Sequence, residues 1–507
     1  MVLLHTRRLS LDPARQGDLP PLQSNGFTYD ALLTYAHAGG PQALHLIPDL
    51  ALRVPVPSNH GTTYTFRLRP GIRYSDGRPV RASDFRRAIE RLFRVQSGYL
   101  GNYTNIVGAS SCTRKRCNLA RGIVTDDRAG TIVFRLHAPD PGFRSSLTAI
   151  ATAPVPPGTP LHALDKTAIP GTGPYIVARA NKHEIRYIRN PKFSEWSHAA
   201  QPDGNPDEIV MRYGLTQSQE AREVEAGTAD WTADGIPASL QPEVLTRFTA
   251  QLHKLPIAET DFFRLNTKQA PFNDLRVRRA LNLATDRTAI VRMYGPAVSF
   301  PTCQVLPPSF LGYRRFCPYT RDPRAGGRWT APDLARARRL VAASGTRGER
   351  ITVWGDKTFH PTGTRVVRYT VHLLRRLGYR ARALIVAPSV WERHPQVFRK
   401  MQLISSGWAN GSTFEFVNDA LACAAPNNTH FFCDHRLDRA FHQANTLEAT
   451  DPRAAATQWA RIDRKLVNQA AWVPLVNIRW VDFVSARVRN YEADPTIGII
   501  ADQVWLH

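Results

Sequence analysis

The sequence predicts an α/β fold class, because segments with the pattern of strands alternate with segments that have the pattern of amphipathic helices. Residues 64–69 alternate apolar and polar side chains, which is typical of a strand with one buried face. Residues 85–93 instead place apolar side chains at the i, i+3, i+4, i+7 and i+8 spacing of a helix. The same succession returns between residues 262 and 386, which extends the α/β prediction to the second half of the chain.

In the first part of the chain, proline and glycine residues separate the expected elements. A short apolar strand is expected to end at residues 11–14, where Pro13 stops it, and a helix is expected to begin within residues 27–35. Turns are expected at Pro70-Gly71 and at Asp76-Gly77. Further elements are expected as strands at residues 64–69, 131–136, 175–178 and 184–188, and as a helix at 85–93.

In the second part, a strand at residues 262–266 is followed by one helix that continues to about residue 290. The apolar side of this helix is formed by Val277, Ala280, Leu281, Ala284 and Ile290. The remaining elements are a helix that starts near Pro332 with Asp333 in its first turn and stops at Ser344, a helix at residues 368–377, and a strand at 381–386.

Length and composition indicate a soluble globular protein. At about 150 residues per domain, the 507 residues correspond to roughly three packing units. No run of 18 or more apolar residues occurs, which excludes a membrane-spanning helix. The net charge is +24, but basic residues are scattered among acidic ones and no nucleic-acid-binding motif is present. Nucleic acid is therefore not an expected partner.

The six cysteines lie in three local pairs: Cys112 with Cys117, Cys303 with Cys317, and Cys423 with Cys433. Six cysteines permit fifteen pairings, but this clustering favours these three disulfides. The spacings are not those of a tetrahedral zinc site, so no metal is expected. Disulfides indicate an oxidising compartment outside the cytoplasm.

Short motifs are spread along nearly the whole chain. The early ones are PDLA at 48–51, YTFRLRPG at 64–71, and SDGRPV at 75–80 with Asp84. The middle ones are GTGPY at 171–175, RNP at 189–191 and EAGTAD at 225–230. The later ones are NT at 266–267, PF at 271–272, RVRRA at 276–280 and DR at 286–287. Together and in this order, they resemble the family 5 extracellular solute-binding proteins of oligopeptide, dipeptide and nickel ABC importers.

This resemblance implies a two-lobed clamp of the periplasmic-binding-protein type (type II), in which two strands join the lobes. An extra subdomain is inserted in the first lobe. We expect lobe I at residues 1–45, 165–257 and 487–507, the inserted subdomain at 46–164, and lobe II at 258–486. The C-terminal segment would then return to complete the first lobe.

The resemblance also implies a function, that of the extracytoplasmic substrate-binding subunit of an ABC importer. Such a protein captures a peptide or peptide-like small molecule between its lobes at the cell surface or in the periplasm. It performs no catalysis and needs no cofactor, and the sequence contains no GxSxG or HExxH motif. The expected partners are the ligand and the membrane permease subunits. A monomer is expected, attached to the membrane only through a lipid anchor that this chain does not contain.

The start of the chain leaves an alternative open. Residues 1–8 lack the long apolar core and the cleavage site of a secretory leader. We therefore expect that a leader has been removed or that the segment comes from a longer chain. In the alternative interpretation, the same clamp is the ligand-sensing module of a larger regulatory protein. A DNA-binding domain upstream would favour the sensor, and a leader that ends in a lipidated cysteine would favour the importer.

Candidate ligand-binding residues lie in the segment LISSGWAN at 403–410, which resembles a strand and loop that line the ligand cavity in the family. Trp408 could stack on a ligand, and Ser406 and Asn410 could form hydrogen bonds with it. In the alternative interpretation, Trp408 is a core aromatic residue.

The position three residues after this tryptophan bears on the type of ligand. Peptide-binding members commonly carry an acidic residue there, which pairs with the α-amino group of the peptide. In this chain the position is Gly411, and a buried ammonium group without a counter-charge is costly. Recognition of a free amino terminus is therefore in doubt, unless Asp419 or Glu415 takes over this role.

Further candidate ligand-binding residues are Ser24, Phe27, Tyr294, Phe300 and Trp354, each of which could instead be a packing residue. Lone histidines such as His5, His60 and His360 are more often surface or satisfied core residues, so they do not indicate a nickel or haem site.

Overall fold

The computed structural model divides the chain into two compact units. Unit 1 comprises Met1–Leu255 and Val481–His507, and unit 2 comprises Pro256–Trp480. The structure describes residues 1–6, 10–15, 26–140, 142–237, 239–324, 326–356, 363–386, 395–425, 427–448, 451–494 and 498–507. Two neighbouring strands, β11 (Leu252–Leu265) and β16 (Trp472–Phe483), carry the chain from one unit to the other. The finer division into a first lobe with an inserted subdomain stays a prediction.

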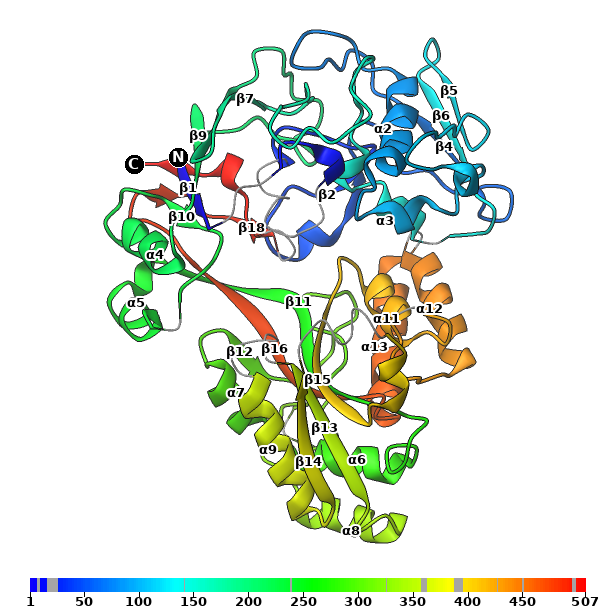
Figure 1. Cartoon of the computed structure of the whole chain (residues 1–507), viewed down its shortest axis with the longest axis vertical. Helices are drawn as coiled ribbons and strands as arrows, with labels where there is room; N and C mark the ends of the chain where they lie inside the picture. Colours follow the sequence, from blue (N-terminus) through cyan, green and yellow to red (C-terminus); the bar gives the residue numbers. More distant parts are fainter. Residues whose placement is uncertain are drawn as a thin grey trace. The chain divides into compact units, whose positions relative to one another are not determined.

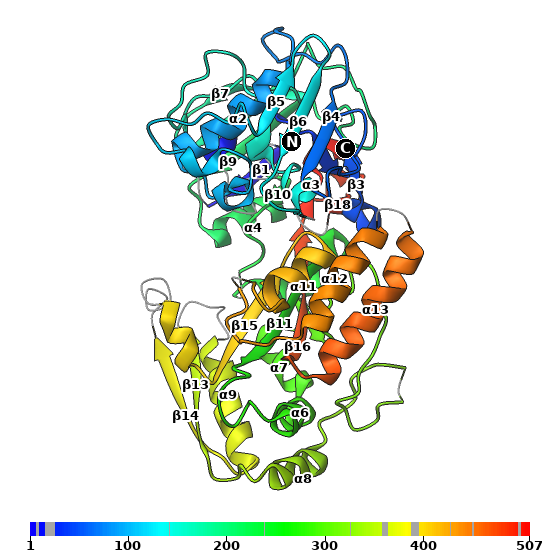
Figure 2. The same ribbon diagram turned by 90° about the vertical axis from the view of Figure 1, so that its right-hand side faces the viewer.

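The first sheet of unit 1 brings together distant parts of the sequence. Its strand order is β10 (Trp231–Thr232), β1 (Val2–His5), β9 (Glu208–Tyr213), β8 (Glu184–Arg189) and β7 (Tyr175–Ala180). Strand β1 runs parallel to both of its neighbours. Residues Val488, Ile499 and Val504 from the end of the chain pack in the same core as Leu3 and Tyr187. Figures 1 and 2 show both chain ends near this sheet, so the C-terminal segment completes a core that the N-terminus begins.

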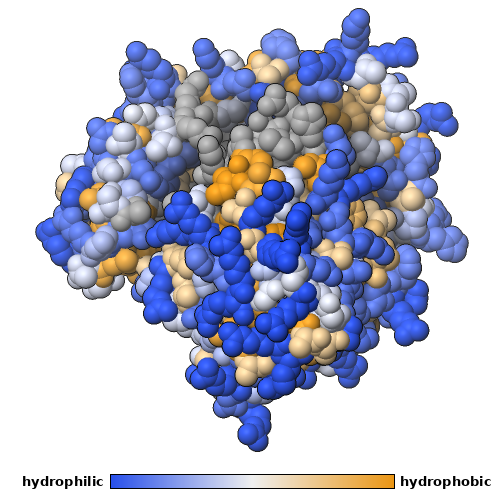
Figure 3. Space-filling model, turned by 60° about the horizontal axis from the view of Figure 1, so that its bottom comes forward, coloured by the Kyte–Doolittle hydropathy of each residue, from blue (hydrophilic) through white to orange (hydrophobic). Residues whose placement is uncertain are grey.

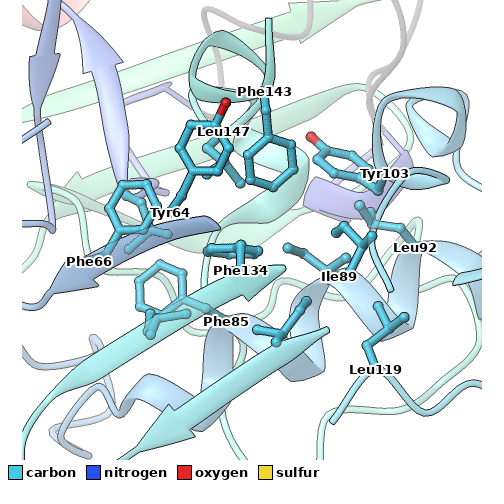
Figure 4. Packing of buried hydrophobic residues seen from close by; sticks show 14 of the residues in the cluster. Tyr64, Phe66, Phe85, Ile89, Leu92, Tyr103, Leu119, Phe134, Phe143 and Leu147 are labelled. Carbon is cyan, nitrogen blue, oxygen red and sulfur yellow. The ribbon is translucent and has the colours of Figure 1, made fainter. Parts of the chain in front are cut away.

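A second core of unit 1 lies between a smaller sheet and a helix. The sheet has the order β4 (Thr63–Arg67), β6 (Thr131–Arg135) and β5 (Ile123–Asp126), and the helix is α2 (Ala82–Val95). Figure 4 shows how Phe66 and Phe134 from the sheet face Phe85 and Ile89 from the helix. The rings of Phe66 and Phe134 meet edge to face at 5.7 Å between centroids, a favourable geometry for aromatic pairs. The alternation and the helical spacing expected for these segments are thus confirmed.

Unit 1 also contains shorter elements. These are the strand pairs β2 (Leu33–Tyr35) with β3 (Leu46–Pro48), β17 (Val488–Arg489) with β20 (Trp505–Leu506), and β18 (Ala493–Asp494) with β19 (Gly498–Ile499), and the helices α3 (Phe143–Ser146), α4 (Gln217–Glu225) and α5 (Gln241–Arg247).

Two expectations for the start of the chain are wrong. Residues 27–35 do not begin a helix, because their backbone groups bond outward: Ala31 N–H donates to Asp49 at 3.1 Å, and residues 33–35 pair with β3. Residues 11–14 do not end a strand, because Asp12 turns its side chain back onto Ala14 N–H and a short 3₁₀ turn follows at Pro13–Arg15. In both segments, buried acidic side chains satisfy backbone donors that a helix or sheet would otherwise satisfy.

The described strands of unit 2 form one sheet with helices on both faces. The strand order is β12 (Ser299–Pro301), β16, β11, β15 (Leu403–Ala409), β13 (Arg350–Asp356) and β14 (Arg380–Val386). In Figures 1 and 2, α11 (Thr413–Leu421), α12 (His435–Glu448) and α13 (Pro452–Asn468) form one group of helices. The other helices are α6 (Leu275–Ala284), α7 (Arg287–Tyr294), α8 (Leu334–Ser344) and α9 (Gly363–Arg376).

The single helix expected to end near residue 290 is instead two helices, α6 and α7. The break lies at Thr285, whose backbone is extended and whose hydroxyl donates to Leu281 O at 2.7 Å. Asp286 then caps α7 by accepting a hydrogen bond from Ala289 N–H at 3.0 Å. The apolar spacing is similar on both sides of this break, so the pattern does not reveal it.

All six cysteines lie in the described part of the chain and pair as expected: Cys112 with Cys117, Cys303 with Cys317, and Cys423 with Cys433. Each bond closes a loop within one unit. The disulfides therefore close short local loops and do not join elements that are distant in the sequence.

The described helices include none that is long and apolar enough to cross a membrane. Figure 3 shows one face of the molecule, where hydrophilic side chains cover most of the surface and apolar groups form separate patches.

A buried ion pair holds three segments of unit 1 together. The Arg91 guanidinium donates to both oxygens of Asp12, at 2.6 and 2.5 Å, and to the carbonyls of Pro160 and His162. The two side chains are 1% and 0% exposed, and Leu164 N–H also donates to Asp12. Asp12 thus links the start of the chain to α2 and to residues 160–164.

We expect the substitution Asp12→Ala to lower the free energy of unfolding by about 3–5 kcal/mol, because it leaves the Arg91 charge buried without a partner. Urea denaturation followed by circular dichroism measures the change. The matched control is Asp203→Ala, which removes an exposed partner of Arg189 and should change the stability by less than about 1 kcal/mol. Equal effects of the two substitutions would contradict this role for Asp12.

Candidate functional site

The candidate site of unit 2 is built on the antiparallel pair of strands β11 and β15. In its register, Thr260 faces Trp408, Phe262 faces Ser406, and Arg264 faces Ile404. Because side chains alternate along a strand, these six side chains share one face of the sheet. The pairing therefore brings Arg264, which the sequence interpretation did not select, onto the same face as Ser406 and Trp408.

Trp408 links this face to helix α11. Its indole N–H donates to Phe416 O at 2.8 Å, and its side chain is partly exposed. The ring is therefore held in one orientation by a contact within the unit, while part of its surface stays accessible. This arrangement accommodates both interpretations of Trp408, as a packing residue and as a platform for a ligand.

The loop after Trp408 folds back onto α11. Asn410 donates to Asp419 at 3.2 Å, and its side-chain oxygen accepts a hydrogen bond from Gly411 N–H at 2.7 Å. The hydroxyl of Ser412 caps the helix at Glu415 N–H. Burial raises the pKa of Asp419, while the amide donors of Asn418 and Asn410 lower it. The structure thus places an acidic side chain next to Asn410, although Gly411 itself offers none.

Ser406 accepts a hydrogen bond from the Arg264 guanidinium at 2.9 Å. The other terminal nitrogen of Arg264 donates to the hydroxyl of Thr429, a residue 165 positions away in the sequence. Burial lowers the pKa of Arg264 to about 10, so the guanidinium stays charged at neutral pH. Among the described residues, no carboxylate forms an ion pair with it.

Tyr294 lies against the opposite face of the sheet. Burial and the nearby Asp261 raise the pKa of Tyr294, and burial and Glu259 raise that of Asp261. The register places Asp261 opposite Gly407, where a Cβ would lie 2.4 Å from an Asp261 oxygen. A larger residue at position 407 would therefore force the Asp261 and Glu259 carboxylates to move. Tyr294 is on the other side of the sheet from Trp408.

The other predicted ligand residues lie in different parts of the fold. Phe27 is 2% exposed in the core of unit 1, with its ring edge to face against Tyr175 and Tyr187. Phe300 lies in β12, with the Arg479 guanidinium 4.8 Å above its ring. Trp354 lies in β13 opposite Ile404, and so in the row that also contains Arg264. Ser24 lies outside the described residues.

Unit 1 contains a hollow that the sequence did not indicate. Its volume is about 660 Å³, and it is lined by residues 38–40, 42, 252–255 and 491–493. His253 stacks on Tyr491 at 3.6 Å between ring centroids, and the Tyr491 hydroxyl donates to Asp482 at 2.6 Å. Burial lowers the pKa of His253, which favours the neutral imidazole.

Cys423, Cys433 and His435 lie within 4.8 Å of one another, the spacing of metal ligands. The two cysteines are joined in a disulfide, so they offer no thiolate to a metal ion.

Comparison with known proteins identifies the class. The sequence profile of the bacterial extracellular solute-binding proteins, family 5 (middle region) matches residues 45–423. The chain therefore belongs to this family, as its motifs indicated. Family 5 proteins are extracytoplasmic and bind solutes for ABC importers, so the predicted class of the chain, an extracytoplasmic solute-binding protein, is confirmed.

Individual relatives resemble most of the chain. The glutathione-binding protein GsiB of Salmonella typhi is 26% identical over 466 residues, which cover 88% of this chain and 83% of that protein. GsiB of Escherichia coli (strain K12) is 25% identical over 464 residues, with 87% and 82% covered.

Solved structures confirm the fold. The clavulanic acid biosynthesis oligopeptide binding protein 2 superimposes with a TM-score of 0.84 at 23% identity, covering 99% of this chain and 94% of the other. The unliganded open form of the periplasmic murein tripeptide binding protein MppA has a TM-score of 0.80 at 19% identity, with 100% and 97% covered. The chain thus has the predicted α/β fold of a two-lobed clamp.

We expect the substitution Trp408→Phe to lower the free energy of unfolding by about 1 kcal/mol, because it keeps an aromatic ring but removes the donor to Phe416 O. Guanidinium denaturation measures the change. Trp505→Phe is the matched control: this ring is 52% exposed, and its replacement should change stability by less than about 0.5 kcal/mol. No difference between the two variants would mean that the indole hydrogen bond does not hold α11.

Proposed function

We propose that the chain captures a peptide or peptide-like small molecule and delivers it unchanged to the permease subunits of an ABC importer. The observation that carries this proposal is the partly exposed row of Ser406, Arg264 and Trp408 on one sheet face, which combines hydrogen-bonding groups with an aromatic surface. The names of the relatives support it, since they include proteins that bind glutathione, murein tripeptide and the peptide RPPGFSPFR.

The proposed protein is a binding protein and not an enzyme. The polar groups at the β11–β15 face form hydrogen bonds with neighbouring side chains. Arg264 donates to Ser406 and Thr429, and Asn410 donates to Asp419. This arrangement suits recognition of a ligand and contains no nucleophile hydrogen-bonded to a base among these residues. We further propose that the protein acts as a monomer, without a metal or cofactor, and that a lipid anchor holds it at the membrane.

Mass spectrometry of small molecules released from natively purified protein tests this proposal. Recovery of short peptides or peptide-like molecules with unaltered covalent structure is the expected result. Recovery of a different class of solute, or of a cleaved product that accumulates with time, would overturn it.

We expect the affinity for a recovered peptide to change less than about threefold when its amino terminus is acetylated, because position 411 lacks a carboxylate for the ammonium group. Isothermal titration calorimetry of the free and the acetylated peptide measures the difference. The variant Gly411→Asp should restore a preference of about tenfold for the free amine, since a charge-assisted hydrogen bond contributes about 1.4 kcal/mol or more.

If acetylation abolishes binding to the unaltered protein, another acid supplies the amine anchor. The variant Asp419→Asn then identifies it, because this substitution keeps the side-chain shape and removes the charge next to Asn410.

A further inference from the structure

Among the described residues of unit 2, three arginines have guanidinium groups that lie largely inside the protein. In two of them, carbonyl groups accept hydrogen bonds from the guanidinium. Arg287 is 0% exposed and donates to the carbonyls of Thr302, Pro474 and Asn282. Arg278 is 8% exposed and donates to the carbonyls of Phe272, Asn273, Gln469 and Ala470. These acceptors point the negative ends of their dipoles at the guanidinium groups and so stabilise the charge.

Arg264 is held differently. Its partners are the hydroxyls of Ser406 and Thr429, and its Nε–H has no acceptor among the described residues. Unlike Arg287, the side chain keeps part of its surface exposed, and so do those of Ser406 and Thr429. The guanidinium group therefore keeps one unused donor, the buried Nε–H, beside partly exposed side chains.

A buried imidazole lies near this guanidinium group. His430 is 1% exposed, and neither of its ring nitrogens has a hydrogen-bond partner among the described residues. Burial and the charge of Arg264 both lower its pKa, so the ring is neutral and offers one N–H donor. His430 follows Thr429 directly, and its carbonyl accepts from Thr267 N–H at 2.9 Å, which ties this part of the loop to the end of β11.

The groups around Arg264 thus contain one positive charge, unused N–H groups and two hydroxyls that already accept from the guanidinium. Water could satisfy these N–H groups, but it would bring no negative charge. A carboxylate would supply both the acceptors and the charge, and its two oxygens match the planar fork of a guanidinium group.

We propose that Arg264, Ser406, Thr429 and His430 form a binding site within unit 2 for a carboxylate group of the captured ligand. The proposal rests on the proposed function for the identity of the ligand, and it adds a specificity: the ligand carries an acidic group. Trp354 and Trp408, on the same sheet face, flank this site across the strands. The site is therefore continuous with the residues expected to contact a ligand.

Acetate tests the site without knowledge of the natural ligand, and acetamide is its neutral counterpart of the same shape. The experiment uses the full chain, dialysed until mass spectrometry detects no bound small molecule. We expect 100 mM acetate to raise the Tm of the transition in which unit 2 unfolds, relative to 100 mM acetamide at equal ionic strength. For a dissociation constant on the order of 10 mM, the rise is about 3 °C if unit 2 unfolds by itself and about 1 °C if the whole chain unfolds in one step. Saturation-transfer NMR of the acetate methyl group provides a direct readout of binding.

The variant Arg264→Met should lose the response to acetate in both measurements. Without acetate its Tm should be equal to or higher than that of the unaltered protein, because an uncompensated buried charge has been replaced by an apolar side chain of similar length. Arg264→Lys keeps the charge but not the fork, and should keep a weaker response.

Each of two control variants removes one positive charge outside the proposed site. Arg382 lies on β14 and its side chain is exposed. The variant Arg382→Met should therefore leave both the Tm and the acetate response unchanged. Arg278→Met should lower the Tm, since it leaves several carbonyls without donors, and should keep the acetate response.

An equal rise of the Tm in acetamide or in chloride, or a full acetate response in Arg264→Met, would overturn the proposed site. These outcomes leave the proposed function intact, because peptide capture is tested separately by the released ligand. Conversely, acetate binding that depends on Arg264, together with release of a non-peptide acid, would support the site and contradict the peptide proposal.

Discussion

The arrangement of the candidate site depends on the register between strands β11 and β15. This register places Arg264, Ser406 and Trp408 on one face and Asp261 beneath Gly407 on the other. A shift by one residue would exchange the two faces, because side chains alternate along a strand. It would also place a residue with a Cβ opposite Asp261, and the Asp261 carboxylate would have to move to make room for it. Gly407 thus favours the observed pairing.

Strands β11 and β16 connect the β11–β15 pair to the rest of the protein. Strand β11 begins in unit 1 and continues through unit 2, and its neighbour β16 returns the chain to unit 1. In the β11–β15 pair, the Trp408 indole N–H donates to Phe416 O. Phe262 stacks on Trp472 of β16 at 3.6 Å between ring centroids. Helix α11 is therefore hydrogen-bonded to the sheet face that carries Arg264, and the ring of Trp472 packs on Phe262 of the same face.

Elements that depend on local side-chain periodicity could be predicted from the sequence, whereas features that depend on tertiary contacts could not. The strand at residues 64–69 and the helix at 85–93 were predictable, since their alternation reflects which side chains face one core. Residues 27–35 were not, because acceptors from elsewhere, such as Asp49, take the donors that a helix would use. The break between α6 and α7 depends on the Thr285 hydroxyl and the Asp286 cap, which do not alter the apolar spacing. Arg264 was missed for a related reason: no local motif marks it within the segment DFFRLN, and its partner Thr429 lies 165 residues away.

The amino-acid sequence by itself determined the class of protein, the α/β succession and the disulfide pairing, because ordered motifs, side-chain periodicity and cysteine spacing are local properties of the chain. It also showed that position 411 lacks an acid. Only the tertiary structure decided that Trp354, Arg264, Ser406 and Trp408 share one sheet face and that Thr429 and His430 come to lie beside them. The reason is physical: strand register, burial and the absence of a counter-charge arise from contacts between distant segments, and no local pattern encodes them.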